Sequence, residues 1–299
     1  MKELNLAYPD KSEIKFKVDH YPDGQRNLTI TNLDGNLKSD IWLANNSINQ
    51  PVKIKSRLNN FQDLEIIICA TKALRNLGVK EIHLYAPYFL GSRSDRLFKR
   101  GSTNYLKDVI CPIINSLNFE SVTVMDSHSN VLEACLNNFE KEDNLELVEF
   151  ALSSINPGKQ FNLIVVDAGA SKRCDLLAQQ LSKEYDINLI QCHKKRDTKT
   201  GQIEKLEVYS NDLQNLPCII IDDIADGAAS FIYCVQELQK IQNYKNSFLV
   251  VSHGIFSKGF SELSKYFEGI YCTNSYSDNF MPGLKNKNGD LLLKQLYVF

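Results

Sequence analysis

The sequence predicts an α/β protein in which mainly parallel sheets are flanked by helices, arranged as two domains. Short apolar runs alternate with longer segments of helical spacing, which is the pattern of parallel β/α units. The chain has 299 residues, of which 43% are apolar, so it is long enough for two domains and too apolar for general disorder. Polar residues gather where the predicted strands end, and ligands of such sheets bind beyond the carboxyl ends of the strands.

The first domain is expected to span residues 1–148. Its opening, residues 14–43, resembles a hairpin with Asp-Gly turns at 23–24 and 34–35. The alternation then begins, with helices predicted near 58–77 and 104–117 and strands predicted at 81–87 and 121–126.

The second domain is expected to span residues 149–299, after an Asn-Pro-Gly segment at 156–158 interrupts the pattern. Two helices are predicted, at 172–184 and 231–241. The predicted strands lie at 161–167, 188–193, 217–222, 246–253 and 269–274. A return of the last strand to the first domain is left open.

The net charge and the pattern of cysteines limit the kinds of binding partner and the cellular compartment that are expected. The 34 basic and 36 acidic residues give a net charge of −2, which indicates neither a nucleic-acid nor a membrane partner. No signal peptide is evident, and no apolar run approaches the roughly 18 residues of a bilayer span. The eight cysteines include no C-x-x-C pair, and several lie in apolar runs. These features predict a cytoplasmic protein with reduced thiols.

The most informative segment is Ile219 to Phe231, where an apolar run meets two carboxylates. Asp222 and Asp223 are followed by Asp226 and a turn of very small residues, and helical spacing begins at 231. Such a turn can wrap a phosphate with backbone N–H groups at a helix N-terminus. The acids would then face sugar hydroxyls or a metal, so a sugar phosphate is the predicted ligand.

Two other segments are basic. The first runs from Pro87 to Arg96, and its cations suit a polyphosphate, although a solvated, salt-bridged loop explains them equally well. The second, His193-Lys-Lys-Arg196, precedes a polar loop over 197–210 that suits a mobile lid. Its cations could neutralise charge on a transferred phosphoryl group, and an exposed basic patch is the alternative.

Three further segments are ambiguous by themselves. Asp126-Ser-His128 pairs a carboxylate with an imidazole that could serve a metal or a structural hydrogen bond. Asp167-Ala-Gly-Ala170 resembles many strand-to-helix turns, with a carboxylate suited to a metal or to sugar hydroxyls. Tyr21-Pro-Asp-Gly-Gln25 reads most simply as a hairpin turn.

The order of these segments resembles the ribose-phosphate pyrophosphokinase family over nearly the whole chain. On the ATP side, the resemblance implies one loop that contacts ATP from a neighbouring subunit and a second segment that binds ATP directly. It assigns His128, from the family's Asp-Leu-His, to a Mg²⁺ site or the triphosphate. The implied ATP-binding residues are Tyr21, Asp23, Gln25, Arg93, Ser94 and His128.

On the other side of the reaction, the resemblance implies a metal and ribose role for Asp167. Lys194 and Arg196 match the Lys-x-Arg pair that stabilises the transition state, with Arg196 also near the ribose 5-phosphate. His253-Gly-Ile-Phe-Ser257 and Thr273-Asn-Ser275 match two further family segments. The implied ribose-5-phosphate loop consists of Asp222, Asp223, Asp226, Gly227, Ala228, Ala229 and Ser230.

The chain departs from the family most at this loop. Gly227-Ala-Ala-Ser230 stands where the family has Thr-Gly-Gly-Thr, and alanine tolerates a positive φ poorly. Either these alanines have ordinary φ angles or the loop is reshaped. Gln25, Ser94 and Ala170 replace a Glu, a Gln and a Gly.

The resemblance implies a Mg²⁺-dependent enzyme of nucleotide biosynthesis. It would transfer the β,γ-diphosphoryl group of ATP to the anomeric hydroxyl of ribose 5-phosphate, giving phosphoribosyl pyrophosphate and AMP. Two similar phosphoribosyltransferase-like domains and a homodimer or hexamer are also implied. Two alternatives stay open: a phosphoribosyltransferase, which leaves Arg93 and His128 unexplained, and a non-catalytic regulatory homologue, which the altered 227–230 turn favours.

Overall fold

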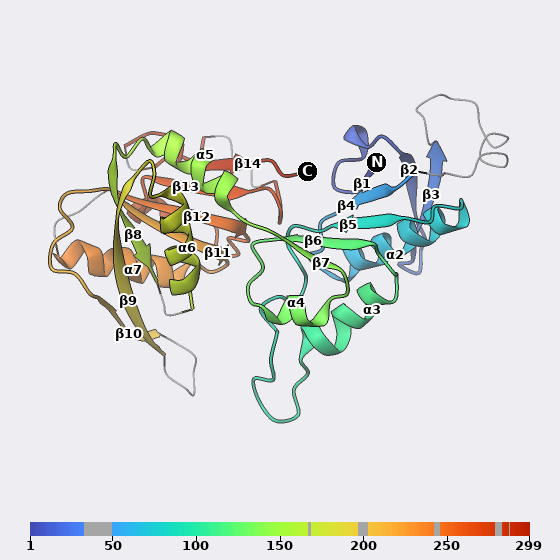
Figure 1. Ribbon diagram of the computed structural model, residues 1–299, viewed down its shortest axis with the longest axis horizontal. Coiled ribbons are helices and arrows are strands. Elements are labelled where there is room, and N and C mark those ends of the chain that lie inside the picture. Colours follow the sequence, from blue (N-terminus) through green and yellow to red (C-terminus); the bar gives the residue numbers. More distant parts are fainter. Residues whose placement is uncertain (33–49, 167–168, 197–202, 242–245, 279–282, 287) are drawn as a thin grey trace. The chain divides into compact units, whose positions relative to one another are not determined.

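The chain forms two compact units, one comprising Met1–Asp143 with Val298–Phe299 and the other Asn144–Tyr297. The computed structural model describes residues 1–32, 50–166, 169–196, 203–241, 246–278, 283–286 and 288–299 (Figure 1). Both units contain a sheet with helices packed on it, as the alternating pattern predicted.

Unit 1 is built on a five-stranded sheet in which every neighbouring pair is parallel. Strands β5 and β6 were predicted, whereas β1, β4 and β7 were not, because each of these three short strands has polar residues at half or more of its four positions. In sheet order the strands are β1 (Lys2–Asn5), β4 (Val52–Lys55), β5 (Ile82–Tyr85), β6 (Ser121–Met125) and β7 (Phe139–Glu142).

The main helix of unit 1 is α2 (Phe61–Asn76), and Asn60 is its N-cap residue. Asn60 Oδ1 accepts a hydrogen bond from the backbone N–H of Asp63 at 2.9 Å, which satisfies one of the unpaired donors of the first turn. Gly78, with φ +84°, follows the last turn as predicted. A π-helical turn (Leu106–Ile110) leads into α3 (Cys111–Asn115), and α4 (Val131–Cys135) follows β6.

The predicted hairpin is present as a separate two-stranded sheet, and a short 3₁₀ turn (Pro9–Lys11) precedes it. Strand β2 (Lys15–His20) pairs antiparallel with β3 (Arg26–Asn32). The second Asp-Gly turn, at 34–35, lies outside the described residues.

Unit 2 contains a seven-stranded sheet that is parallel except at one edge, where β10 runs antiparallel to β9. The expectation of a loop over 197–210 is therefore wrong for 203–208, which form a strand, while 197–202 lie outside the described residues. In sheet order the strands are β10 (Ile203–Val208), β9 (Asp186–Arg196), β8 (Gln160–Val165), β11 (Cys218–Ala225), β12 (Ser247–Gly254), β13 (Gly269–Thr273) and β14 (Leu293–Leu296).

Helices cover both faces of this sheet, which explains why its strands are continuous apolar runs. Ile220 of β11 packs into the core that includes α7 (Ala229–Ile241) and α8 (Leu263–Tyr266). Ile219 and Ile221 point to the opposite face, where α5 (Leu145–Ile155) and α6 (Ser171–Leu181) contribute the partners. Among the described helices, none combines the length and the apolar character that crossing a bilayer requires.

The last strand remains in unit 2, because β14 pairs in parallel with β13. Only the two residues beyond Tyr297 group with unit 1. There the ring of Phe299 lies 6.1 Å from that of Tyr8 and 6.2 Å from that of Tyr85, measured between centroids.

Candidate active site

The acidic pair lies inside strand β11 and not after it. Pairing with β12 continues as far as Ala225, which is opposite Gly254, so the strand ends three residues later than predicted. The side chain of Asp223 is 6% exposed and that of Asp222 is 22% exposed. The pair is therefore held by the sheet backbone, with Asp222 the more accessible carboxylate.

Both carboxylates contact one cation, Arg173, which lies in the first turn of α6. Its Nη1 donates to Oδ1 of Asp222 at 3.0 Å and to Oδ1 of Asp223 at 3.3 Å. The helix predicted over 172–184 includes Arg173, but the sequence gave this residue no role. One signal could have identified it. Arg173 lies in the first turn of the helix that follows β8, and β8 is the parallel neighbour of β11, which carries the two acids.

The surroundings of Asp222 favour its neutral form. Burial, together with the nearby Asp223 carboxyl group, raises the pKa of Asp222 to about 8, and the Arg173 guanidinium opposes this shift. A carboxyl group that changes protonation near neutral pH can either donate or accept a hydrogen bond from a sugar hydroxyl. The acidic pair is thus suited to a ligand rich in hydroxyl groups.

The turn after β11 keeps a left-handed residue despite its alanines. Ala228 has φ +57° and is buried, whereas Gly227 does not have a positive φ. Although Ala229 has no positive φ, the expectation that both alanines could have ordinary φ angles is therefore wrong for Ala228. This conformation costs an L-residue about 1–2 kcal/mol, and strain of this kind is common at ligand sites.

The first residues of α7 place backbone N–H groups next to this turn. The N–H groups of Phe231 and Ile232 already donate to the carbonyl of Ala228, at 3.1 and 3.2 Å. Helix α7 begins at Ala229, two residues earlier than predicted, so Ser230 lies in its first turn. The first N–H groups of a helix have no intrahelical acceptor and suit an anion.

Two segments that matched the family lie on the neighbouring strands β12 and β13 and are joined by hydrogen bonds. Nδ1 of His253 and Oγ of Ser275 are 2.8 Å apart, and both residues are buried. The hydroxyl of Thr273 donates to the Ser252 carbonyl at 2.6 Å. Next to them, the carbonyl of Ala225 accepts from the N–H groups of Ile255 and Phe256, at 2.8 and 3.0 Å. These bonds tie the end of β11 to the 253–256 segment.

Strand β9 brings the predicted catalytic pair to the same edge of the sheet. Ile190 pairs with Ile164, and Ile164 pairs with Ile220 of β11. Lys194 and Arg196 follow farther along β9, so their backbone lies towards the edge at which β11 ends. Asp167, the predicted metal and ribose residue, lies outside the described residues.

In unit 1, three of the predicted ATP-binding residues, Arg93, Ser94 and His128, follow two neighbouring parallel strands, β5 and β6. The loops after these strands are joined because the hydroxyl of Ser129 donates to Oδ2 of Asp95 at 2.6 Å. Arg93 and His128, one in each loop, are exposed to solvent, and Ser94 is partly exposed. The structure therefore brings together the two segments that carry Arg93, Ser94 and His128.

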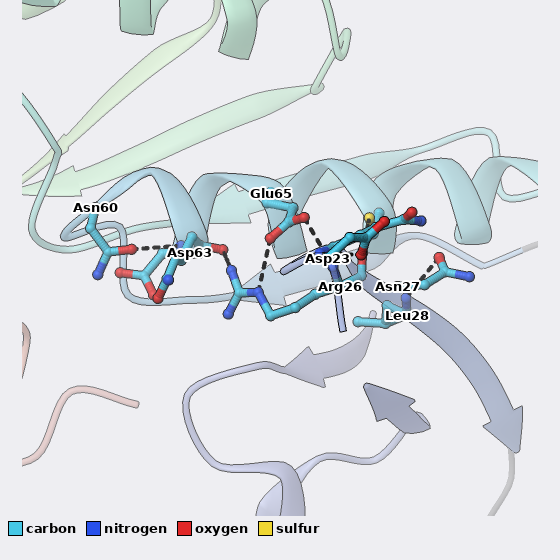
Figure 2. Close-up of polar contacts among 10 residues, drawn as sticks. Asp23, Arg26, Asn27, Leu28, Asn60, Asp63 and Glu65 are labelled. Atoms are coloured by element: carbon cyan, nitrogen blue, oxygen red, sulfur yellow. Dashed lines mark hydrogen bonds and ion pairs between the residues drawn. The ribbon is translucent and has the colours of Figure 1, made fainter. Parts of the chain in front are cut away.

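The 21–25 segment is a regular hairpin turn. The N–H of Gln25 donates to Oδ1 of Asp23 at 3.1 Å, and Gly24 has φ +91°. Figure 2 shows the next residue, Arg26, reaching Glu65 on α2 with Nε 2.8 Å from Oε2. The Arg26 guanidinium lowers the pKa of Glu65 through this hydrogen bond. Tyr21, Asp23 and Gln25 are exposed at the end of this anchored hairpin.

A metal site made by protein side chains alone is not found in the described part of the chain. No group of three or more His, Cys, Asp or Glu side chains is placed there to hold a metal ion. Mg²⁺ usually keeps water and substrate phosphate oxygens as most of its ligands. The exposed His128 fits such a partial role, in which the protein supplies one ligand or a contact to the phosphates.

No family model matches the chain, but individual proteins do. A ribose-phosphate pyrophosphokinase from Pyrococcus furiosus is 28% identical over 280 residues, which cover 92% of this chain and 91% of the relative. One from Mycoplasmopsis pulmonis is 26% identical over 234 residues, covering 77% and 68%. Ribose-phosphate pyrophosphokinase 4 from Saccharomyces cerevisiae is 25% identical over 265 residues, covering 87% and 76%.

A solved structure shares the fold. The crystal structure of phosphoribosylpyrophosphate synthetase from Mycobacterium smegmatis matches with a TM-score of 0.72 over 97% of this chain and 88% of that chain, at 14% identity. The resemblance seen in the order of the motifs thus extends to whole sequences and to the fold. The chain is a divergent relative of the ribose-phosphate pyrophosphokinases, similar to them over most of its length.

Proposed function

We propose that the protein is a ribose-phosphate diphosphokinase. It transfers the β,γ-diphosphoryl group of ATP to the anomeric hydroxyl of ribose 5-phosphate and releases phosphoribosyl pyrophosphate and AMP. The observation that carries the proposal is the strand–turn–helix around Asp222 and Ala228, in a chain similar to ribose-phosphate pyrophosphokinases over most of its length. This supports a sugar-phosphate acceptor site in unit 2.

In this proposal each group of residues has a task. The 226–230 turn and the first N–H groups of α7 hold the 5-phosphate, while Asp222 and Asp223 receive the ribose hydroxyls. Lys194 and Arg196 offset the negative charge that develops on the transferred group. In unit 1, Arg93, Ser94 and His128 bind the nucleotide and its phosphates.

Magnesium is proposed as the cofactor and would enter with ATP. His128 and Asp167 would contact it, with water and phosphate oxygens completing its coordination. The ion would neutralise phosphate charge and align the triphosphate.

We also propose a homo-oligomer, a dimer or a hexamer. The exposed hairpin end with Tyr21, Asp23 and Gln25 is suited to reach ATP in a neighbouring subunit. A cytoplasmic location is proposed as well, since all eight cysteines are free thiols.

A non-catalytic homologue was favoured in the sequence by the altered 227–230 turn. The positive φ of Ala228 reduces that argument, because the turn retains a strained conformation that an unused loop has no reason to keep.

The test is direct. The purified protein is incubated with ATP, Mg²⁺ and ribose 5-phosphate, and AMP and phosphoribosyl pyrophosphate are followed together. We expect AMP formation that requires ribose 5-phosphate and falls at least about 100-fold in Lys194→Ala, the loss typical of one transition-state contact. Lack of such AMP would refute the proposal. Pyrophosphate release from phosphoribosyl pyrophosphate and a purine base would instead identify a phosphoribosyltransferase.

A further inference from the structure

Lys258 lies against the turn that is proposed to hold the 5-phosphate. A methyl group built on Gly227 would be 3.5 Å from Cε and 3.7 Å from Cδ of Lys258, which is ordinary van der Waals contact. The lysine stem therefore packs over Gly227, and its ammonium group lies one bond beyond Cε. No sequence motif pointed to this residue.

The backbone that carries Lys258 is fixed to the same turn. Ile255 and Phe256 donate to the carbonyl of Ala225, the last residue of β11. The N–H of Gly259 donates to the Phe256 carbonyl at 2.8 Å, which closes a tight turn around position 258. The rings of Phe256 and Phe260 are buried with centroids 4.6 Å apart. Lys258 is thus presented by an anchored turn, although its own side chain is exposed.

The charges near Lys258 indicate an electrostatic role for this lysine. Asp222, Asp223 and Asp226 place three acidic side chains within five residues, and those that are ionised would repel a phosphate dianion bound at the turn. Arg173 contacts the first two of these acids. In the part of the chain that the structure describes, Lys258 makes no ion pair or hydrogen bond, so its charge is available to a ligand.

We propose that Lys258 binds the 5-phosphate of the sugar substrate, adding a cation to the backbone donors of the 226–230 turn. This inference rests on the proposed function, since it names a further ligand for the same acceptor. A lysine near a phosphate acts as a point charge and needs no fixed geometry, which suits its flexible stem. The residue would raise affinity for the sugar phosphate without taking part in the chemical step.

The test uses Lys258→Gln, which removes the charge and keeps part of the stem, and Lys258→Arg, which keeps the charge. Lys240→Gln is the matched control, because Lys240 is exposed in the last turn of α7 and pairs with Glu237. We expect Lys258→Gln to raise KM for ribose 5-phosphate about tenfold, a typical loss for one charge-assisted contact. KM for ATP and kcat should change less than about twofold, and Tm should change by less than about 2 °C. Lys258→Arg should recover most of the affinity for ribose 5-phosphate.

Binding of ribose 5-phosphate by calorimetry separates the two proposals. If the wild-type protein binds the sugar phosphate and Lys258→Gln binds it about tenfold more weakly, the lysine assignment holds even without turnover, and the diphosphokinase proposal alone fails. If the wild-type protein turns over and Lys258→Gln has the same affinity and KM as Lys240→Gln, the lysine assignment fails and the function stands. Absence of any binding to the wild-type protein overturns both.

Discussion

Arg173 donates from Nη1 to Oδ1 of Asp222 at 3.0 Å and so connects helix α6 to strand β11. The same nitrogen is 3.3 Å from Oδ1 of Asp223. One guanidinium therefore contacts two acidic side chains that the sheet places next to each other. Three properties of this region can be tested: the stabilisation by Arg173, the protonation of Asp222, and the backbone strain at Ala228 in the turn that follows.

Replacing Arg173 by Gln should destabilise the protein by about 2 kcal/mol. Removal of Arg173 leaves the buried Asp223 carboxylate, and Asp222 where it is ionised, without their cation, and the partial exposure of Asp222 keeps the cost below that of a fully buried pair. Urea unfolding at neutral pH measures the change. Lys172→Gln is the control, because Lys172 is exposed in the same turn of α6 and should shift the unfolding free energy by less than about 0.5 kcal/mol. Equal stability of the two variants would contradict the pairing.

The stability contributed by Asp222 should fall as the pH rises. Its folded pKa, about 8, is above the ordinary value, so the folded protein keeps a proton that the unfolded chain releases. This stabilisation is complete below about pH 4 and is lost by about pH 8. Relative to Asp222→Asn, the unfolding free energy of the wild-type protein should fall by about 1–3 kcal/mol across this range.

Urea unfolding at several pH values, with no sugar phosphate present, provides the measurement. Asp175→Asn, at an exposed position of α6, should keep the wild-type profile. A pH profile of Asp222→Asn that is parallel to that of the wild-type protein would show that Asp222 does not titrate in this window.

Valine at position 228 should be far more harmful than valine at position 229. Ala228 is buried with φ +57°, a conformation that is a severe outlier for a β-branched residue. Ala228→Val should cost about 2 kcal/mol or more, whereas Ala229→Val, at the exposed start of α7, should cost about 0.5 kcal/mol. Thermal or urea unfolding compares the two. If both variants lose the same stability, position 228 is not strained.

Gly254→Ala should disturb the acceptor loop through Phe256. The new methyl group would collide with the Phe256 ring and lie 3.1 Å from Sγ of Cys272. Because the N–H of Phe256 holds the Ala225 carbonyl, movement of this residue would also shift the end of β11. We expect a loss of about 1–3 kcal/mol in the unfolding free energy and weaker binding of ribose 5-phosphate.

Gly227→Ala provides the stability control for this substitution. Its methyl group would meet only the Lys258 stem at ordinary contact distance, and its φ is not positive. A stability of Gly254→Ala equal to that of Gly227→Ala would mean that Phe256 adjusts without cost.

Phe299→Ala should weaken unit 1. The Phe299 ring packs against those of Tyr8 and Tyr85, and the Arg57 guanidinium lies 5.5 Å from its centroid. Loss of these contacts should lower the unfolding free energy by about 1–3 kcal/mol. Phe98→Ala, whose ring is 63% exposed, should change it by less than about 0.5 kcal/mol. Unfolding monitored by tyrosine fluorescence and by circular dichroism tests the difference, and equal effects would contradict a stabilising role.

Much of the fold was predictable because the underlying signals are local. The apolar run before Asp222, the helical spacing after residue 231 and the Asp-Gly hairpin turn each lie within one segment of chain. They correctly predicted the parallel α/β class and most of the strands, and they placed the acidic pair before a turn of small residues. Strands β1, β4, β7, β10 and β14 were missed, because short or polar strands owe their formation to pairing with a neighbour.

The sequence by itself determined which chemistry collects at the strand ends: carboxylates and a small-residue turn in one unit, cations and a histidine in the other. Only the tertiary structure decided which of these groups meet. Arg173 reaches Asp222 across 49 positions of sequence, and Lys258 reaches Gly227 from the turn after β12. The physical reason is that parallel pairing of β8, β11 and β12 brings their carboxyl ends to one edge, whereas spacing along the chain carries no record of that order. The left-handed φ of Ala228 was also decided by the tertiary structure, because the packing around the turn overrides the preference of alanine for a negative φ.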